Sequence, residues 1–96
     1  MRDLITKNRR LAILRFLSDE PDYALNTSVL QTALAHIGHG VSRDRVEADC
    51  AWLAEQGLAD VNSLDIPVTV VRITARGVDV ARGVAVHPGV DRPLPR

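Results

Sequence analysis

The sequence predicts a mainly α-helical domain with one small β-hairpin, in the order three helices, hairpin and a fourth short helix. Apolar residues recur at helical spacing in segments that begin at capping residues and end at glycines, and the pattern then changes to stretches rich in β-branched residues. A chain of 96 residues fits one domain. We expect residues 1–83 to form it. Residues 84–96, which contain three prolines, are expected to form an extended or disordered tail.

The first helix is expected over residues 6–18, where helix-forming residues run without Gly or Pro. Leu14 lies on one apolar face of this helix. A second set of apolar side chains projects away from that face: Ile5, Ala12 and Phe16. We therefore expect the helix to be covered on two sides, by its own core and by something else. Residues 19–24, with Pro21 among them, break the helical pattern and are expected to form the first loop.

Two further helices follow, separated by a short turn. Asn26 is a favourable N-cap for the second helix, and Gly38 can adopt the left-handed conformation that ends it. Ser42 caps the third helix after only three intervening residues, and Gly57 ends it. A short glycine-containing turn between two capped helices is typical of a helix-turn-helix, because it makes the third helix cross the second steeply.

Beyond the third helix, the segments 58–62 and 66–73 are rich in β-branched residues and are separated by residues typical of turns. This pattern predicts a β-hairpin. Pro67 cannot donate a backbone hydrogen bond, so the second strand is expected to begin at an edge of the sheet. Thr74 then caps a short fourth helix that ends at Gly83.

This order of elements resembles the winged-helix family. Residues 52–58 (WLAEQGL) and 73–77 (ITARG) are similar to its signature, in which the third helix ends in L-x-x-x-G-L and the second strand leads into L-T-x-x-G. The likeness covers residues 6–83. Three further segments are similar to small proteins of Mu-like phages and prophages that are often labelled ArsR-like: RLAILR (10–15), YALN (23–26) and PGVDRP (88–93). The resemblance implies a winged helix-turn-helix, and with it a DNA-binding protein.

In such a fold, the third helix enters the major groove of double-stranded DNA and residues near its N-terminus reach the bases. The candidate nucleic-acid contacts on this helix are Ser42, Arg43 and Arg45. Either arginine could instead form an ion pair with Glu47 or Asp49. At 100° per residue, the outward arc of the helix is acidic or small: Asp44, Glu47, Ala48, Ala51 and Glu55. The hairpin offers only Asp60 and Asp65, and acidic groups near phosphates oppose binding.

The first helix supplies a second candidate nucleic-acid surface, because it is strongly basic although the whole chain has a net charge of zero. The candidates there are Arg9 and Arg10, joined by Arg15 and by two arginines of the fourth helix, Arg76 and Arg82. They would contact DNA if the first helix faced outward. The alternative interpretation is an ordinary solvated basic face, which needs no ligand.

A protein interface is the alternative to DNA binding. Trp52 lies near the exposed arc that carries Ala48 and Ala51, and tryptophan often anchors interfaces. It could equally pack beneath the hairpin or against the first helix. Together with Ile5 and Phe16, it makes a homodimer through the first helix plausible. A protein adaptor that binds a partner of phage origin on the same scaffold therefore stays open beside a DNA-binding regulator or DNA-handling factor.

Enzymatic and metal-binding functions have little support in the sequence. Helix caps already account for Ser42 and Thr74, and the carboxylates are scattered. His36, His39 and Cys50 are too few for a closed zinc site, so we expect no metal and no cofactor. The apolar stretches are too short to span a membrane. The expectation is a cytoplasmic protein without catalytic residues.

Overall fold

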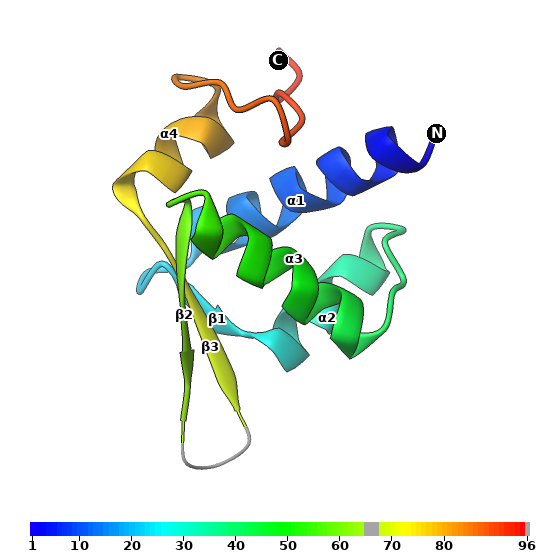
Figure 1. Ribbon diagram of the computed structural model, residues 1–96, viewed down its shortest axis with the longest axis vertical. Coiled ribbons are helices and arrows are strands. Elements are labelled where there is room, and N and C mark those ends of the chain that lie inside the picture. The colour runs from blue at the N-terminus through cyan, green and yellow to red at the C-terminus, as the bar shows by residue number, and fades with distance from the viewer. Residues whose placement is uncertain (65–67, 96) are drawn as a thin grey trace.

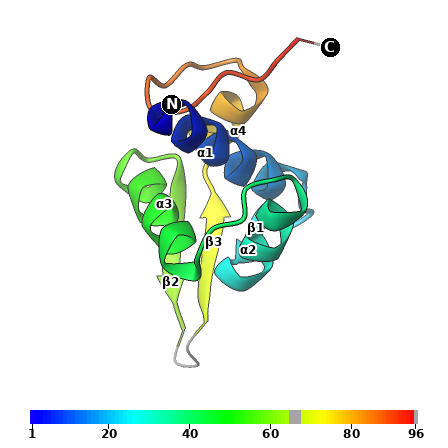
Figure 2. The same cartoon turned by 90° about the vertical axis from the view of Figure 1, so that its right-hand side faces the viewer.

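The computed structural model describes residues 1–64 and 68–95, and the predicted turn residue Asp65 and the predicted edge position of Pro67 lie outside them. The described residues form four helices and a three-stranded antiparallel sheet, in the predicted order with one additional strand (Figure 1). The elements are α1 (Arg2–Asp19), β1 (Ala24–Asn26), α2 (Thr27–His36), α3 (Arg43–Glu55), β2 (Ala59–Ser63), β3 (Thr69–Ile73) and α4 (Ala75–Arg82). The hairpin of β2 and β3 extends away from the helices, whereas α4 and the C-terminal segment lie at the opposite end, beside α1 (Figure 2).

The predicted helix starts are confirmed for α2, α3 and α4. The side-chain oxygens of Asn26, Ser42 and Thr74 each accept a hydrogen bond from the backbone N–H three residues later. Gly57 adopts a φ of +75°, and the backbone N–H of Leu58 then donates to the carbonyl of Leu53, which closes the end of α3. These local signals set the length of α3 and therefore which of its side chains face outward.

The first helix is longer than predicted, because it starts at Arg2 rather than at residue 6. No residue in its first turn breaks a helix, and Asp3 lies there, where a negative charge interacts favourably with the helix dipole. The additional turn brings Leu4 and Ile5 onto the helix, and both side chains are exposed. The outer face of α1 thus runs further than the sequence pattern indicated.

A short strand that the sequence analysis missed begins at residue 24, the last residue of the expected first loop. Residues Ala24–Asn26 form β1 and pair with β3, so the strand order is β1-β3-β2 rather than a two-stranded hairpin. Tyr23 precedes this strand with a φ of +59°, and its backbone N–H donates to the carbonyl of Glu20, which turns the chain from α1 back to the sheet. Three residues are too few to show the alternating pattern of a strand.

The core lies between the helices and the inner face of the sheet and is aliphatic. Its fully buried side chains come from α1, α2, α3, the start of the hairpin and β3, and include Leu14, Leu34, Leu53, Leu58 and Val71. The hairpin is in register from Ala59 opposite Ile73 to Ser63 opposite Thr69. Helix α3 is thereby fixed against α1, α2 and the sheet with its opposite side in water.

The C-terminal segment, expected to be extended or disordered, contains no helix or strand within residues 84–95 but packs on the domain. We call this segment the C-terminal strap. Val90 of the strap is 4 % exposed and joins the core, and the backbone N–H of Asp91 donates to the carbonyl of Lys7 in α1. The composition of the segment suggested a free tail, and the contact with α1 and α3 that orders it is not visible in a local pattern.

Candidate nucleic-acid interface

The outer side of α3 is exposed as the helical projection predicted. Val46, Cys50 and Leu53 are fully buried, so the residues opposite them must face water. The exposed arc consists of Asp44, Glu47, Ala48, Ala51 and Glu55. Every residue of this arc is acidic or a small alanine, and the basic residues of α3 are confined to its first turn.

The first turn of α3 brings together the three predicted contacts on this helix. The hydroxyl of Ser42 is occupied by the capping hydrogen bond from the backbone N–H of Arg45. The guanidinium of Arg43 reaches back to α2, where Nε donates to Oε1 of Gln31 (3.2 Å) and Nη2 donates to Oγ of Ser28 (3.2 Å). Arg43 is thus held across two helices at the surface. No sequence pattern pointed to Gln31 in this role.

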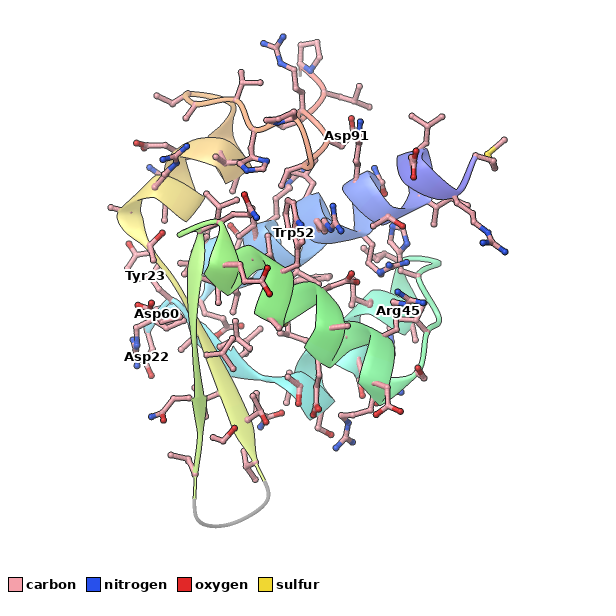
Figure 3. The ribbon with its side chains drawn as sticks, in the orientation of Figure 1. Asp22, Tyr23, Arg45, Trp52, Asp60 and Asp91 are labelled. Carbon is pink, nitrogen blue, oxygen red and sulfur yellow. The ribbon has the colours of Figure 1, made fainter. Side chains whose placement is uncertain are left out.

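Arg45 is exposed, and its side chain makes no hydrogen bond or ion pair within the part of the chain that the structure describes (Figure 3). The alternative ion pairs of Arg43 or Arg45 with Glu47 or Asp49 are not formed among these residues. The carboxylate of Glu47 instead accepts a hydrogen bond from the hydroxyl of Thr27 (3.3 Å). The first turn therefore presents two arginine side chains that no carboxylate of the described residues neutralises by direct contact.

The hairpin also carries a positive charge that the sequence analysis overlooked. Arg72 lies on β3 directly opposite Asp60 of β2 and is exposed. Its Nη1 donates to the backbone carbonyl of Asp22 (2.6 Å), which holds it at the base of the hairpin. Asp60 lies on the other side of the molecule from Arg45 (Figure 3). Arg72 thus partly balances the negative charge of Asp60, and Asp60 does not lie near the first turn of α3.

Arg9 is buried, whereas both interpretations of the first helix, a nucleic-acid surface and a solvated basic face, expected it at the surface. Its side chain is 5 % exposed and forms a buried ion pair with Asp49 of α3, which is 3 % exposed. Two hydrogen bonds connect the guanidinium and the carboxylate. Burial of either charge alone would be costly, so each residue depends on the other. The pair connects α1 to α3 inside the domain.

Arg10 is likewise withdrawn from the surface, because the C-terminal strap covers it. Its guanidinium carbon lies 3.7 Å from the centre of the Trp52 ring, and Nη1 donates to the carbonyl of Gly89 (3.0 Å). Trp52 therefore packs against the first helix, one of the two arrangements considered for a non-interface role. A methyl group added at Gly89 would overlap the Trp52 ring, so the strap approaches the ring at a glycine.

His87 of the strap also packs against Trp52, and its imidazole is uncharged. The backbone N–H of Gly89 donates to Nδ1 (3.0 Å), so that nitrogen carries no proton, and Nε2 lies 3.0 Å from Oε1 of Gln56. The ring also meets Trp52 edge to face. Burial lowers the pKa of His87, and the charges of Arg76 and Arg10 lower it further. The strap is therefore held by contacts that require an uncharged imidazole.

The remaining arginines of the second predicted surface do not form one basic face with Arg9 and Arg10. Arg15, Arg76 and Arg82 are exposed. Arg15 and Arg82 line one shallow hollow together with Asp19, so this surface also carries a negative charge. The first turn of α3 is the better candidate for binding an anion such as phosphate.

The three residues considered as metal ligands lie in unrelated environments. Nδ1 of His36 is 3.1 Å from the carbonyl of Thr32, and Nε2 of His39 is 2.8 Å from Oδ1 of Asn8. Cys50 is in the core, where burial, aided by nearby carboxylates, raises the pKa of its thiol to about 12. Within residues 1–64 and 68–95, no three side chains of the metal-binding types come together. None of the helices in this range is both long enough and apolar enough to cross a bilayer.

Comparison with known proteins links the chain to a bacteriophage. It is 50 % identical to a protein of Escherichia phage Mu described as uncharacterized protein gp26, over 98 % of this chain and 96 % of that protein. It is 41 % identical to an uncharacterized protein of Haemophilus influenzae, over 78 % of this chain and 72 % of the relative. No protein family model and no solved structure matches it. Since the identity to the Mu protein extends over nearly the whole of both chains, this chain belongs to the family of phage Mu gp26.

Proposed function

We propose that the chain is a winged helix-turn-helix protein of phage type that binds double-stranded DNA in the host cytoplasm, in regulation or in a DNA-handling step. The observation that carries the proposal is the pair Arg43 and Arg45 at the exposed first turn of α3. Arg43 is held there by hydrogen bonds to α2, and Arg45 is exposed. The order of the helices and of the β2–β3 hairpin supports the winged-helix assignment.

The charge distribution limits how α3 meets DNA. Arginine side chains and backbone N–H groups at a helix N-terminus both favour phosphate, so the first turn suits the DNA backbone. Further along the helix, Ala48 and Ala51 offer no hydrogen bond to bases, and Glu55 repels phosphates. We therefore expect end-on contact through the first turn, rather than insertion of the whole helix, and few phosphate contacts per chain. Such binding is weakly specific, and the slope of its salt dependence is set by the small number of phosphate contacts.

Fluorescence anisotropy with a labelled duplex of mixed sequence tests this proposal. The double variant Arg43→Ala with Arg45→Ala should weaken binding and reduce the slope of log affinity against log salt by about 2, one for each lost phosphate contact. The matched control, Arg76→Ala with Arg82→Ala, removes the same charge from α4 and should leave the slope nearly unchanged. Equal losses in both variants, or no loss in the first, would contradict DNA binding at α3.

A second candidate, a protein adaptor, is favoured by the exposed acidic arc. Asp44 and Glu55 flank the small side chains of Ala48 and Ala51, which allow close approach of a partner backbone. A basic helix of a phage-encoded protein has the matching charge. Capture of such a protein from induced cells by the wild type, and its loss on Ala51→Arg, would support the adaptor. Recovery by the variant in equal amount would rule out this arc as the binding surface.

A further inference from the structure

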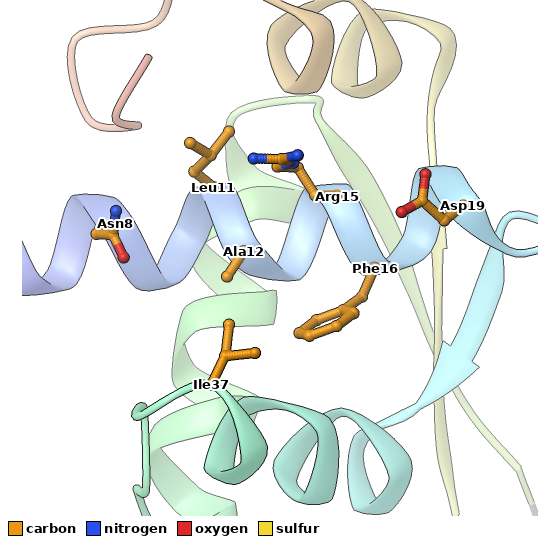
Figure 4. Close-up of a pocket in the computed structure, with 7 residues that line it drawn as sticks. All are labelled: Asn8, Leu11, Ala12, Arg15, Phe16, Asp19 and Ile37. Atoms are coloured by element: carbon orange, nitrogen blue, oxygen red, sulfur yellow. The ribbon is translucent and has the colours of Figure 1, made fainter. Parts of the chain in front are cut away.

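A shallow groove of about 310 Å³ lies between α1 and the C-terminal end of α2 (Figure 4). Its apolar wall is formed by Ala12, Phe16 and Ile37, and Arg15 and Asp19 lie along the same stretch of α1. Ile37 is 52 % exposed although it lies beside other apolar groups. Side chains of this kind favour contact with another apolar surface over contact with water.

The charged residues of the groove are of opposite sign and lie one helical turn apart. Arg15 and Asp19 both line it, yet the single ion pair among the described residues is the buried Arg9–Asp49 pair. The guanidinium of Arg15 extends along α1 away from Asp19 (Figure 4). Both charges are therefore available to a second molecule, and the groove presents one cation and one anion in a fixed order along α1.

We propose that this groove is the contact surface between two copies of the chain, related by a two-fold axis across α1. In a dimer with two-fold symmetry every contact occurs twice, with the roles of the two copies exchanged. A surface that carries a cation and an anion side by side is therefore complementary to the same surface on a second copy. With the two α1 helices antiparallel, Arg15 of one copy meets Asp19 of the other on both sides of the axis, and Phe16 of each copy covers the partner's groove. A parallel arrangement would place like charges together and is disfavoured.

This interface leaves the proposed DNA contact free. The groove is at the C-terminal end of α2, whereas Arg43 binds to Ser28 and Gln31 in the first half of that helix. Self-association is therefore independent of DNA binding, and it is measured without DNA. Failure of one proposal does not imply failure of the other.

Sedimentation velocity over a range of protein concentrations tests the proposal with a charge exchange. The wild type should show a reversible monomer–dimer equilibrium. Asp19→Lys replaces two attractive pairs per dimer by two repulsive ones and should raise the dissociation constant roughly tenfold or more. The exchange variant, Arg15→Asp with Asp19→Lys, restores opposite charges and should return the constant to within about threefold of the wild-type value.

The apolar part of the contact is tested separately. Ile37→Lys should weaken the dimer strongly, whereas the control Val29→Lys, at an exposed apolar position of α2 outside the groove, should not. All four positions are on the surface, and far-UV circular dichroism verifies folding of each variant. A wild type that stays monomeric at the highest attainable concentration overturns the proposal. So does a dimer that is insensitive to Ile37→Lys, or one that the charge exchange fails to restore.

Discussion

The buried ion pair between α1 and α3 makes a quantitative prediction about stability. Arg9 is 5 % exposed and Asp49 is 3 % exposed, and two hydrogen bonds join their side chains. Asp49→Ala removes the carboxylate and leaves the guanidinium buried without its partner. An uncompensated buried charge of this kind costs about 3–5 kcal/mol in the free energy of unfolding. A domain of this size has only about 5–14 kcal/mol in total, so the variant should be severely destabilised.

Replacing both charges should undo most of this loss. Arg9→Met with Asp49→Leu removes the desolvation cost together with the attraction, and such apolar replacements of buried pairs are often close to neutral. The double variant should therefore lie within about 2 kcal/mol of the wild type, and the double-mutant cycle should give a coupling energy of at least about 2 kcal/mol. An independent contribution of the two residues would give a coupling near zero.

Urea and thermal unfolding followed by far-UV circular dichroism measure these differences. For a domain of this length, Asp49→Ala should lower Tm by at least about 12 °C. Arg15→Met, which removes an exposed arginine from the same helix, serves as the control and should change the unfolding free energy by less than about 0.5 kcal/mol when measured at low protein concentration. A loss below about 1 kcal/mol for Asp49→Ala would refute a buried, mutually dependent pair.

Three further predictions concern the strap and the core. Gly89→Ala should displace the strap, cost about 1–3 kcal/mol and shift the emission of Trp52 to longer wavelength, whereas unchanged emission and Tm would show that the strap is not packed there. The pKa of His87 is lowered from its ordinary value of 6.5, so the unfolded chain takes up a proton first, and stability should be complete above pH 6.5 and decline as the pH falls through that value towards the folded pKa. His87→Gln should reduce this decline only in part, because the pKa of His39 is lowered as well. Unfolding curves at several pH values measure the decline, and an unchanged decline in this variant would contradict the prediction. Cys50, with a pKa of about 12 and no exposed surface, should react with a thiol reagent at neutral pH only after unfolding, and prompt labelling of the native protein would contradict its burial.

The boundaries of α2, α3 and α4 were predictable because their signals are local, whereas the start of α1, which no side chain caps, was placed too late. The side chains of Asn26, Ser42 and Thr74 each bind a backbone N–H only three residues later in the chain. A glycine with a positive φ follows each of these three helices. The exposed arc of α3 followed from the same information, because a known start and end fix the phase of the helix. Strand β1 escaped prediction, since only its pairing with β3 in space makes those three residues a strand.

The candidate site was predicted in part. Arg43 and Arg45 are at the surface as expected, but the partners of Arg43 come from a different helix. The burial of Arg9 had a readable signal, because it precedes the fully buried Ile13 by one turn and so lies towards the core. Asp49 similarly follows Val46 by three residues, on the buried side of α3.

The strap could not be foreseen from composition. Prolines and glycines were interpreted as signs of an extended or disordered tail, although they equally suit a segment that packs in extended form. Gly89 lies against Trp52 where no larger residue fits, and this requirement exists only once α1 and α3 are in place. A tertiary contact decided the structure of the segment, and the surface role considered for Arg10 and Trp52 changed with it.

Binding of DNA by the first turn of α3 is tested most directly by a two-dimensional ¹H–¹⁵N NMR titration of the labelled protein with a short duplex. The proposed function predicts that the largest chemical-shift changes fall on the backbone amides of residues 42–45 and on those around Ser28 and Gln31, whose side chains hold Arg43. It predicts little change in α4 and the strap. A spectrum that does not respond to the duplex, or changes confined to α1 and α4, would contradict it.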